Sequence, residues 1–169
     1  MVTVKNEKLT KNNYGDKYSE HLFDQFKIYI AGIEKISERR ESANKYFLGI
    51  NSALIISAGF LLEHMSNKDH MYFMLVIISI LGLVVAVIFS FLLNSYKQIN
   101  TGKFEVLHQI EKELPMKLYS EEWKVLGEGD DYKKYYPFSH IEKLIPIAFG
   151  SVYFVILFSL IIRALMYFY

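Results

Sequence analysis

The sequence predicts an all-α integral membrane protein with three transmembrane helices, long cytoplasmic helical extensions and a small cytoplasmic elbow. Hydrophobic residues make up 52% of the 169 residues and gather in three blocks. These blocks contain uncharged runs of 17, 26 and 19 residues, at 46–62, 71–96 and 144–162. A helix needs roughly 20 apolar residues to cross a hydrocarbon core about 30 Å thick. Three such runs in so short a chain would leave a soluble protein too little polar surface to enclose them.

We therefore expect transmembrane helices at 46–62, 71–96 and 144–163. The first is near the lower length limit, so Lys45 and Glu63 are expected to extend from its ends toward the membrane interfaces. The short connection between the first two spans makes them antiparallel neighbours. The other divisions are a disordered tail, an amphipathic helix, an external hairpin, a helical segment with the elbow, and an external tail, at 1–16, 17–45, 63–70, 97–143 and 164–169.

The positions of lysine and arginine predict the orientation. Of 19 such residues, 9 lie in residues 1–45 and 8 in residues 97–143. Positively charged loops stay on the cytoplasmic side, so the amino terminus and the central segment are expected there and the carboxyl terminus outside. The first 15 residues lack an apolar core after their basic start, so we expect no cleaved signal peptide.

Several function classes are excluded or disfavoured by composition. The absence of cysteine excludes disulfides, thiolate metal sites and a cysteine nucleophile. A net charge of +1 gives no nucleic-acid footprint, and the uncharged spans disfavour a pump or secondary transporter. No spacing of residues assembles a catalytic constellation or a cofactor site, so we expect a protein that is not an enzyme. His64 and His70 in the hairpin leave a weak external metal or pH-sensing site as a minor alternative.

Apolar stripes mark the segments beside the first two spans. In residues 17–45 the stripe repeats at intervals of 4, 3, 4 and 3, and after Tyr96 a second stripe falls within about 100° of arc. The stripe residues are Leu22, Phe26, Tyr29, Ile33 and Ile36, then Ile99, Val106, Leu107, Ile110 and Leu114. The first segment should continue into the first span as one long helix. The stripes are expected to pack against each other or against copies of themselves.

Small residues follow each other at helical spacing in both spans, where they let helix backbones approach closely. They are Gly49, Ala53 and Ser57 in the first span, and Ser79, Gly82, Ala86 and Ser90 in the second. The pattern leaves three alternatives open: packing within the hairpin, packing between subunits, or a pore lining. Asn51 lies away from the first stripe, so its amide needs a partner in the third span or in a neighbouring subunit.

The segment between the second and third spans reads as a compact elbow. Ser120 is expected to cap a short helix that contains a buried Trp123 and ends at Gly127. Ser139 and Glu142 have the spacing of a capping box, which predicts a helix start near residue 140. Pro146 then either kinks this helix or separates a short turn from the third span.

Two adjacent arginines, Arg39 and Arg40, precede the first span. They either contact anionic lipid head groups or act only in setting the topology.

Three tracts carry a resemblance: "YSEHLFDQFKIYIAGIEKISERRESANKYFLGINSALI", "SYKQINTGKFEVLHQIEKELPMKLYSEEWKVLGEG" and "YYPFSHIEKLIP". They resemble the RipA family of octameric membrane proteins, which are small multipass proteins of the bacterial cytoplasmic membrane. The resemblance implies a homo-octamer, with Glu111, Leu114 and Pro115 in an interhelical turn. It places Trp123 and residues 137–142, beginning with Pro137, in the elbow, and it implies no catalytic activity.

These observations predict a non-enzymatic, homo-oligomeric scaffold of the bacterial inner membrane, with envelope homeostasis or stress adaptation as the processes considered. Its expected partners are membrane lipids and copies of itself, with no nucleic acid and no cofactor. The alternative is a gated effector that forms a pore or disrupts the membrane when a cytoplasmic signal arrives, as in bacterial defence systems.

Overall fold

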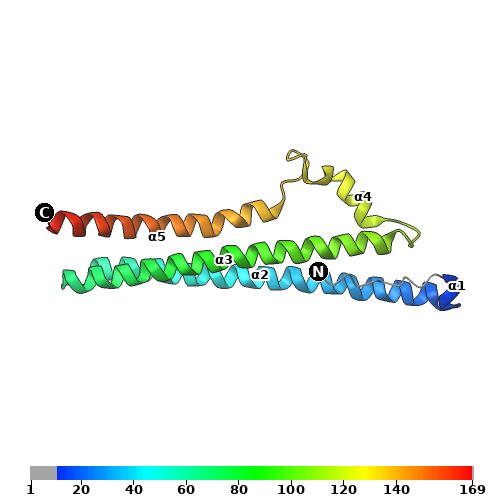
Figure 1. Ribbon diagram of the computed structural model, residues 1–169, viewed down its shortest axis with the longest axis horizontal. Helices are drawn as coiled ribbons and strands as arrows, with labels where there is room; N and C mark the ends of the chain where they lie inside the picture. The colour runs from blue at the N-terminus through cyan, green and yellow to red at the C-terminus, as the bar shows by residue number, and fades with distance from the viewer. Residues whose placement is uncertain (1–10, 169) are drawn as a thin grey trace.

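The computed structural model describes residues 11–168 and is helical, with no strand in that range (Figure 1). Three long helices dominate it: α2 (Tyr18–His64), α3 (Lys68–Glu111) and α5 (Phe138–Phe168). The shorter elements are α1 (Lys11–Tyr14), α4 (Leu118–Val125) and the 3₁₀ turn η1 (Gly127–Gly129). Each long helix contains a stretch apolar enough to cross a membrane. The predicted three-span helical membrane fold is confirmed.

Helices α2 and α3 form an antiparallel hairpin whose two arms run side by side (Figure 1). As predicted, α2 is a single helix that continues from the polar segment into the first span. The link from α2 to α3 is shorter than residues 63–70, because α2 continues to His64 and α3 starts at Lys68. The Asn67 side chain caps α3 by accepting hydrogen bonds from the backbone N–H groups of Asp69 and His70, both at 3.1 Å.

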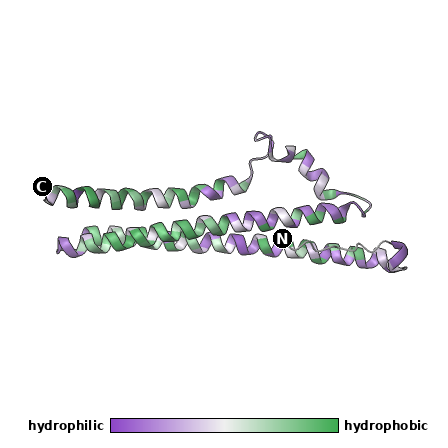
Figure 2. Cartoon of the chain, viewed as in Figure 1, coloured by the Kyte–Doolittle hydropathy of each residue, from purple (hydrophilic) through white to green (hydrophobic). Residues whose placement is uncertain are grey.

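Helix α3 is the central span, since both α2 and α5 pack along it (Figure 1). In the most apolar 18-residue stretch of α3, 28% of the residues are buried inside the protein. The corresponding share is 11% in α2 and 11% in α5. Near the hairpin turn, Ala58, Met71 and Leu75 form a buried apolar cluster. Figure 2 shows hydrophobic residues concentrated in α5 and in the hairpin half beside it, and polar residues concentrated in the other half. We call that other half, residues 18–45 and 97–111, the polar arm.

The predicted stripes lie in the polar arm, where α2 and α3 run side by side and α4 lies close to both. Ile33 and Leu107 are buried at this contact. The remaining members of the two stripes are half-buried except Ile99 and Val106, which are 43% and 41% exposed. At about 100° per residue, Ile99 and Val106 lie roughly 80° and 100° around α3 from the buried Leu107. They are therefore at the edge of the surface that one partner helix covers, which explains their exposure.

The predicted disordered tail, residues 1–16, is wrong where it can be compared. Residues 1–10 lie outside the described range, but Lys11–Tyr14 forms the helix α1. Gly15 then takes a left-handed φ of 95° and turns the chain into α2. The Tyr14 hydroxyl and His21 Nδ1 are 2.8 Å apart, which ties α1 back onto the long helix.

Candidate functional site

A buried polar contact joins the first and third spans near their centre. Tyr153 of α5 is fully buried, and its hydroxyl lies 3.1 Å from the carbonyl oxygen of Asn51 and 3.2 Å from its side-chain Oδ1. Asn51 Nδ2 in turn donates to the carbonyl of Phe47 at 2.8 Å. The expectation that the Asn51 amide finds a partner in the third span is therefore met within a single chain.

The ring of Tyr153 lies against Gly82 of α3. A Cβ built on Gly82 would stand 2.5 Å from three ring carbons, well inside van der Waals contact. Gly82 is thus required by the close approach of a ring on the neighbouring helix, and not by its own backbone conformation. One turn further on, the backbone of Gly150 lies close to the side chain of Ala86.

The two small-residue stripes have different surroundings. Ser79, Gly82 and Ala86 are buried, and Gly82 and Ala86 are covered by α5. Ser90, at the end of the same stripe, is exposed. In contrast, all three members of the α2 stripe are exposed: Gly49, Ala53 and Ser57. Packing within the chain accounts for the α3 stripe and leaves the α2 stripe without a partner in the described residues.

A buried ion pair connects α5 to α2 where the spans meet the polar arm. The Glu142 carboxylate is buried and accepts hydrogen bonds from Arg40 and from the Asn44 side-chain amide. The Arg40 side chain is only 17% exposed. Burial lowers the pKa of its guanidinium and the nearby Tyr135 opposes this change, yet an arginine stays protonated in a protein. The charge on Arg40 is therefore available to balance Glu142.

The two adjacent arginines have separate positions. Adjacent residues of a helix point about 100° apart, so the two side chains face different directions. Arg39 is exposed, whereas Arg40 is paired with Glu142. Of the two, Arg39 has the free surface that a contact with lipid head groups needs, and Arg40 has a partner inside the protein.

The serines predicted to cap the helix starts in the elbow, Ser120 and Ser139, do not cap them. Helix α4 begins at Leu118, so Ser120 lies inside its first turn. The carboxylate of buried Glu111, at the end of α3, performs the capping by accepting from the N–H groups of Tyr119 at 2.7 Å and Ser120 at 3.1 Å. The Ser120 hydroxyl also donates to Glu111. A carboxylate at this place complements the positive end of the helix dipole, so the end of α3 fixes the direction of α4.

The second predicted cap fails for a similar reason. Helix α5 starts at Phe138, just after Pro137, so Ser139 lies inside the helix. Glu142 is engaged with Arg40 and does not close a capping box. Pro146 is buried inside α5, which stays helical on both sides of it. The alternative of a separate turn before the third span is therefore wrong.

The turn after α4 is built on left-handed residues. Gly127, Glu128 and Gly129 have φ values of 74°, 55° and 85°. Gly127 follows α4 after one intervening residue, Leu126, in the position where a left-handed glycine commonly ends a helix. Trp123 lies over Gly129, with ring atoms 3.1 and 3.3 Å from where its Cβ would be, but it is 39% exposed. The prediction of a buried tryptophan is wrong, because one side of the ring faces a cleft.

This cleft, which we call the elbow cleft, has a volume of about 760 Å³. It is lined by α3, α4, the turn after α4, the start of α5, and Arg40 of α2. Three polar atoms of its lining residues are shielded from solvent and have no hydrogen-bond partner in the described range: Arg40 Nε, Asn100 Oδ1 and His108 Nε2. Unpartnered buried polar atoms each cost about 1–3 kcal/mol, so their concentration here marks the cleft as unusual.

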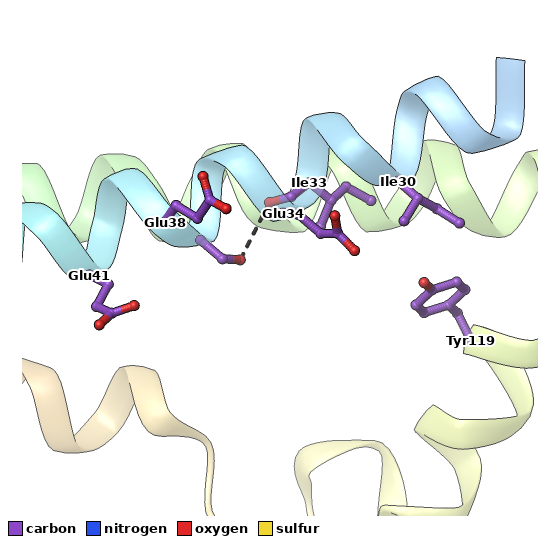
Figure 3. Close-up of a pocket in the computed structure, with 7 residues that line it drawn as sticks. Ile30, Ile33, Glu34, Glu38, Glu41 and Tyr119 are labelled. Carbon is purple, nitrogen blue, oxygen red and sulfur yellow. Dashed lines mark hydrogen bonds between the residues drawn. The ribbon is translucent and has the colours of Figure 1, made fainter.

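A second hollow of about 410 Å³ lies between α2 and α4 (Figure 3). Tyr119 stands on its α4 side, opposite Ile30 and a row of α2 glutamates, Glu34, Glu38 and Glu41. Glu41 is paired with Lys45 at 2.6 Å. Within residues 11–168 no group of three or more histidine and acidic side chains is placed to hold a metal ion. At the end of α2, beside the turn to α3, His64 stacks on Phe60 with ring centroids 4.3 Å apart.

One key residue, Tyr153, was missed by sequence reasoning, and the role of a second, Glu111, was not foreseen. Tyr153 carried a usable signal, because it is the one tyrosine in the middle of a predicted span and a buried tyrosine hydroxyl usually finds a partner. The resemblance placed Glu111 in an interhelical turn, but not its capping role, because that role depends on the fold of the turn that follows it.

No curated protein and no solved structure gives a significant match to the chain. A family model does match the chain, and it covers most of α2, all of α3 and α4, and most of α5. The octameric membrane protein family (8xMP) matches residues 23–162, so the chain belongs to this family of octameric membrane proteins.

Proposed function

We propose that this octameric membrane protein is a non-enzymatic scaffold of the bacterial inner membrane, in which the exposed small-residue stripe of α2 forms the subunit seam. The proposal rests on the contrast between the two stripes. The α3 stripe is used inside the chain, while the α2 stripe is exposed. A family that assembles as an octamer needs a surface on which spans approach closely, and small residues supply it.

The geometry of α2 supports this seam. At about 100° per residue, Gly49 and Ala53 each lie roughly 160° around the helix from Asn51, one on each side. Both residues are therefore on the face of α2 opposite to Asn51. Asn51 faces α5 through its bonds with Tyr153. The stripe therefore faces away from the other two spans of its own chain, where a second copy has access to it.

The polar arm and elbow are proposed to lie in the cytoplasm. Seventeen of the 19 lysines and arginines lie in residues 1–45 and 97–143, and the external turn contains only Lys68. Such an asymmetry favours the cytoplasmic side for the charged segments. The octamer would then present eight elbows to the cytoplasm, as docking points from which it serves envelope homeostasis or stress adaptation.

Native mass spectrometry of the protein in nanodiscs tests the seam. The unchanged chain is expected to give eight copies, whereas Gly49→Leu and Ala53→Leu are expected to move most of the protein to smaller species. Ala148→Leu is the matched control, because Ala148 is an exposed alanine in the span of α5. An intact octamer in both α2 variants, or equal loss in the control, would contradict a seam on α2.

A gated effector is the second candidate, and the Arg40–Glu142 contact favours it. This ion pair links the first turns of α5, directly after the elbow, to α2. A signal that moved the elbow would therefore pull on two spans at once. Ion flux across liposomes that contain the purified octamer distinguishes the two functions: flux supports the effector, and tight liposomes support the scaffold.

A further inference from the structure

Aromatic rings form much of the wall of the elbow cleft. Five of its lining residues are aromatic: Phe104, Tyr119, Trp123, Tyr135 and Phe138. Trp123 and Tyr135 meet edge to face with centroids 6.4 Å apart, and Phe104 and Tyr119 do so at 6.3 Å. Pairs at such angles offer ring faces in different directions to one occupant. Ring faces carry negative potential and attract cations, tryptophan most strongly.

The charges in the cleft have an acidic excess. Glu105, Glu122 and Glu128 line it, and none of them forms an ion pair within residues 11–168. Among the lining residues Lys97 opposes them, since the charge of Arg40 is balanced by Glu142, and Lys124, outside the lining, is close enough to Glu128 to interact with its charge. Two histidines, His108 and His140, complete the titratable lining. With neutral histidines, three negative charges face one positive charge across an aromatic-walled space.

Glu128 is held at this wall at a conformational cost. Its φ of 55° and ψ of 16° lie in the left-handed region, which L residues other than asparagine, aspartate and histidine rarely adopt. Glycines occupy the positions on both sides of it, and a third glycine would fit this turn with less strain. The residue present instead places a carboxylate on the lining of the cleft.

Two of the unpartnered atoms are suited to a ligand that donates hydrogen bonds. Asn100 Oδ1 is an acceptor, and His108 Nε2 is an acceptor when the proton sits on Nδ1. Both residues are on α3 and both line the cleft. Both atoms are shielded from solvent, so these side chains must rotate before an amine in the cleft can donate to them.

We propose that the elbow cleft binds a small organic cation, an amine or quaternary ammonium compound, from the aqueous side. The aromatic walls and the carboxylates supply the recognition, and a volume of about 760 Å³ admits a compound of this class. The carboxylates lie away from the spans: Glu105 is eight residues beyond Lys97 on α3, about 12 Å along the helix. This distance favours a dissolved amine over the amine of a lipid head group.

The single tryptophan makes the binding measurable. Because Trp123 is the only tryptophan in the chain and lines the cleft, intrinsic fluorescence of the whole protein in dodecyl maltoside reports on the site. Choline and putrescine are the probes, at constant ionic strength. At least one is expected to give a saturable change, and 3,3-dimethylbutan-1-ol, the neutral isostere of choline, is expected to bind at least tenfold more weakly. No saturable change up to about 10 mM, beyond the usual range of specific affinities, would overturn the proposal, as would equal binding of the alcohol.

Matched glutamine variants locate the site. Glu122→Gln and Glu128→Gln are expected to weaken binding of the amine at least tenfold. Glu121→Gln is the control, because Glu121 lies beside Glu122 on α4 but does not line the cleft and is paired with Lys124 at 2.8 Å. Glu128→Gly is expected to lose binding of the amine while the melting temperature of the protein stays the same. This outcome would show that binding needs the carboxylate and that the loss does not come from unfolding. Unchanged affinity in the cleft variants, or an equal loss in Glu121→Gln, would overturn the assignment. Displacement of the probe by phosphatidylethanolamine would overturn the choice of a dissolved amine.

Discussion

Gly82 is the position where one added carbon atom should have the largest effect on packing. A Cβ there would overlap the ring of Tyr153 at 2.5 Å, and a rigid, fully buried ring has little room to move. Gly82→Ala is expected to destabilise the protein by about 1–3 kcal/mol, the usual effect of overpacking. Thermal unfolding followed by circular dichroism measures it. Gly59→Ala, which meets no atom within 4 Å, is the matched control and should be neutral.

The Tyr153 hydroxyl tests a separate contribution at the same place. Tyr153→Phe keeps the ring against Gly82 and removes only the hydrogen bond to Asn51. The expected loss is about 1 kcal/mol, because hydrogen bonds between membrane helices are modest. Unfolding in mixed micelles measures it, with Tyr46→Phe as the control, since Tyr46 is 65% exposed. Equal stability of both variants would show that Asn51 finds another partner.

Among elements, the contact between α2 and α5 is expected to depend on the Arg40–Glu142 pair. Arg40→Met leaves a buried carboxylate without its cation, and Glu142→Met leaves the guanidinium without its anion. Each single change is expected to cost about 3–5 kcal/mol, and the double change less than either, since it removes both charges together. A double-mutant cycle by thermal unfolding checks this. Additive losses would mean that the two residues act independently.

The long helices were predictable, whereas the elements between them were predicted only in outline. Uncharged runs and apolar stripes depend on the chain alone, so the continuity of α2 and the positions of the spans followed from them. Caps depend on which side chain reaches the helix end. Ser120 had suitable local spacing, but Glu111 arrives there through the fold of the turn, and Glu142 is taken by Arg40 from another helix. Local spacing contains no information about either competitor.

For the whole molecule, the proposed orientation is testable because the chain has no cysteine. Ser66→Cys and Asp130→Cys each introduce a single thiol at an exposed position, one in the turn between α2 and α3 and one in the elbow. In intact spheroplasts a membrane-impermeant maleimide is expected to label only Ser66→Cys, and after lysis both. Labelling of Asp130→Cys before lysis would reverse the orientation.

The arrangement of the whole molecule was only partly within reach of the sequence. The position of Asn51 in a span indicated that its amide needed a partner. The sequence did not indicate which of the two small-residue stripes α5 would cover. That distinction depends on Tyr153 meeting Gly82, a contact between helices far apart in the chain. The number eight comes from membership of the family, because no spacing within one chain specifies how many copies close a ring.

The separation of Asn51 and Tyr153 by 102 residues gives their contact a place in time during synthesis. The first two spans are complete well before α5 leaves the ribosome, and at about 5–20 residues per second Tyr153 follows Asn51 by roughly 5–20 s. During that interval the side-chain amide oxygen of Asn51 in the nascent hairpin lacks the Tyr153 hydroxyl as its partner, and no ring covers Gly82. A factor that binds nascent transmembrane helices could bind the hairpin during this interval, and the packing of α5 onto the hairpin would then displace the factor.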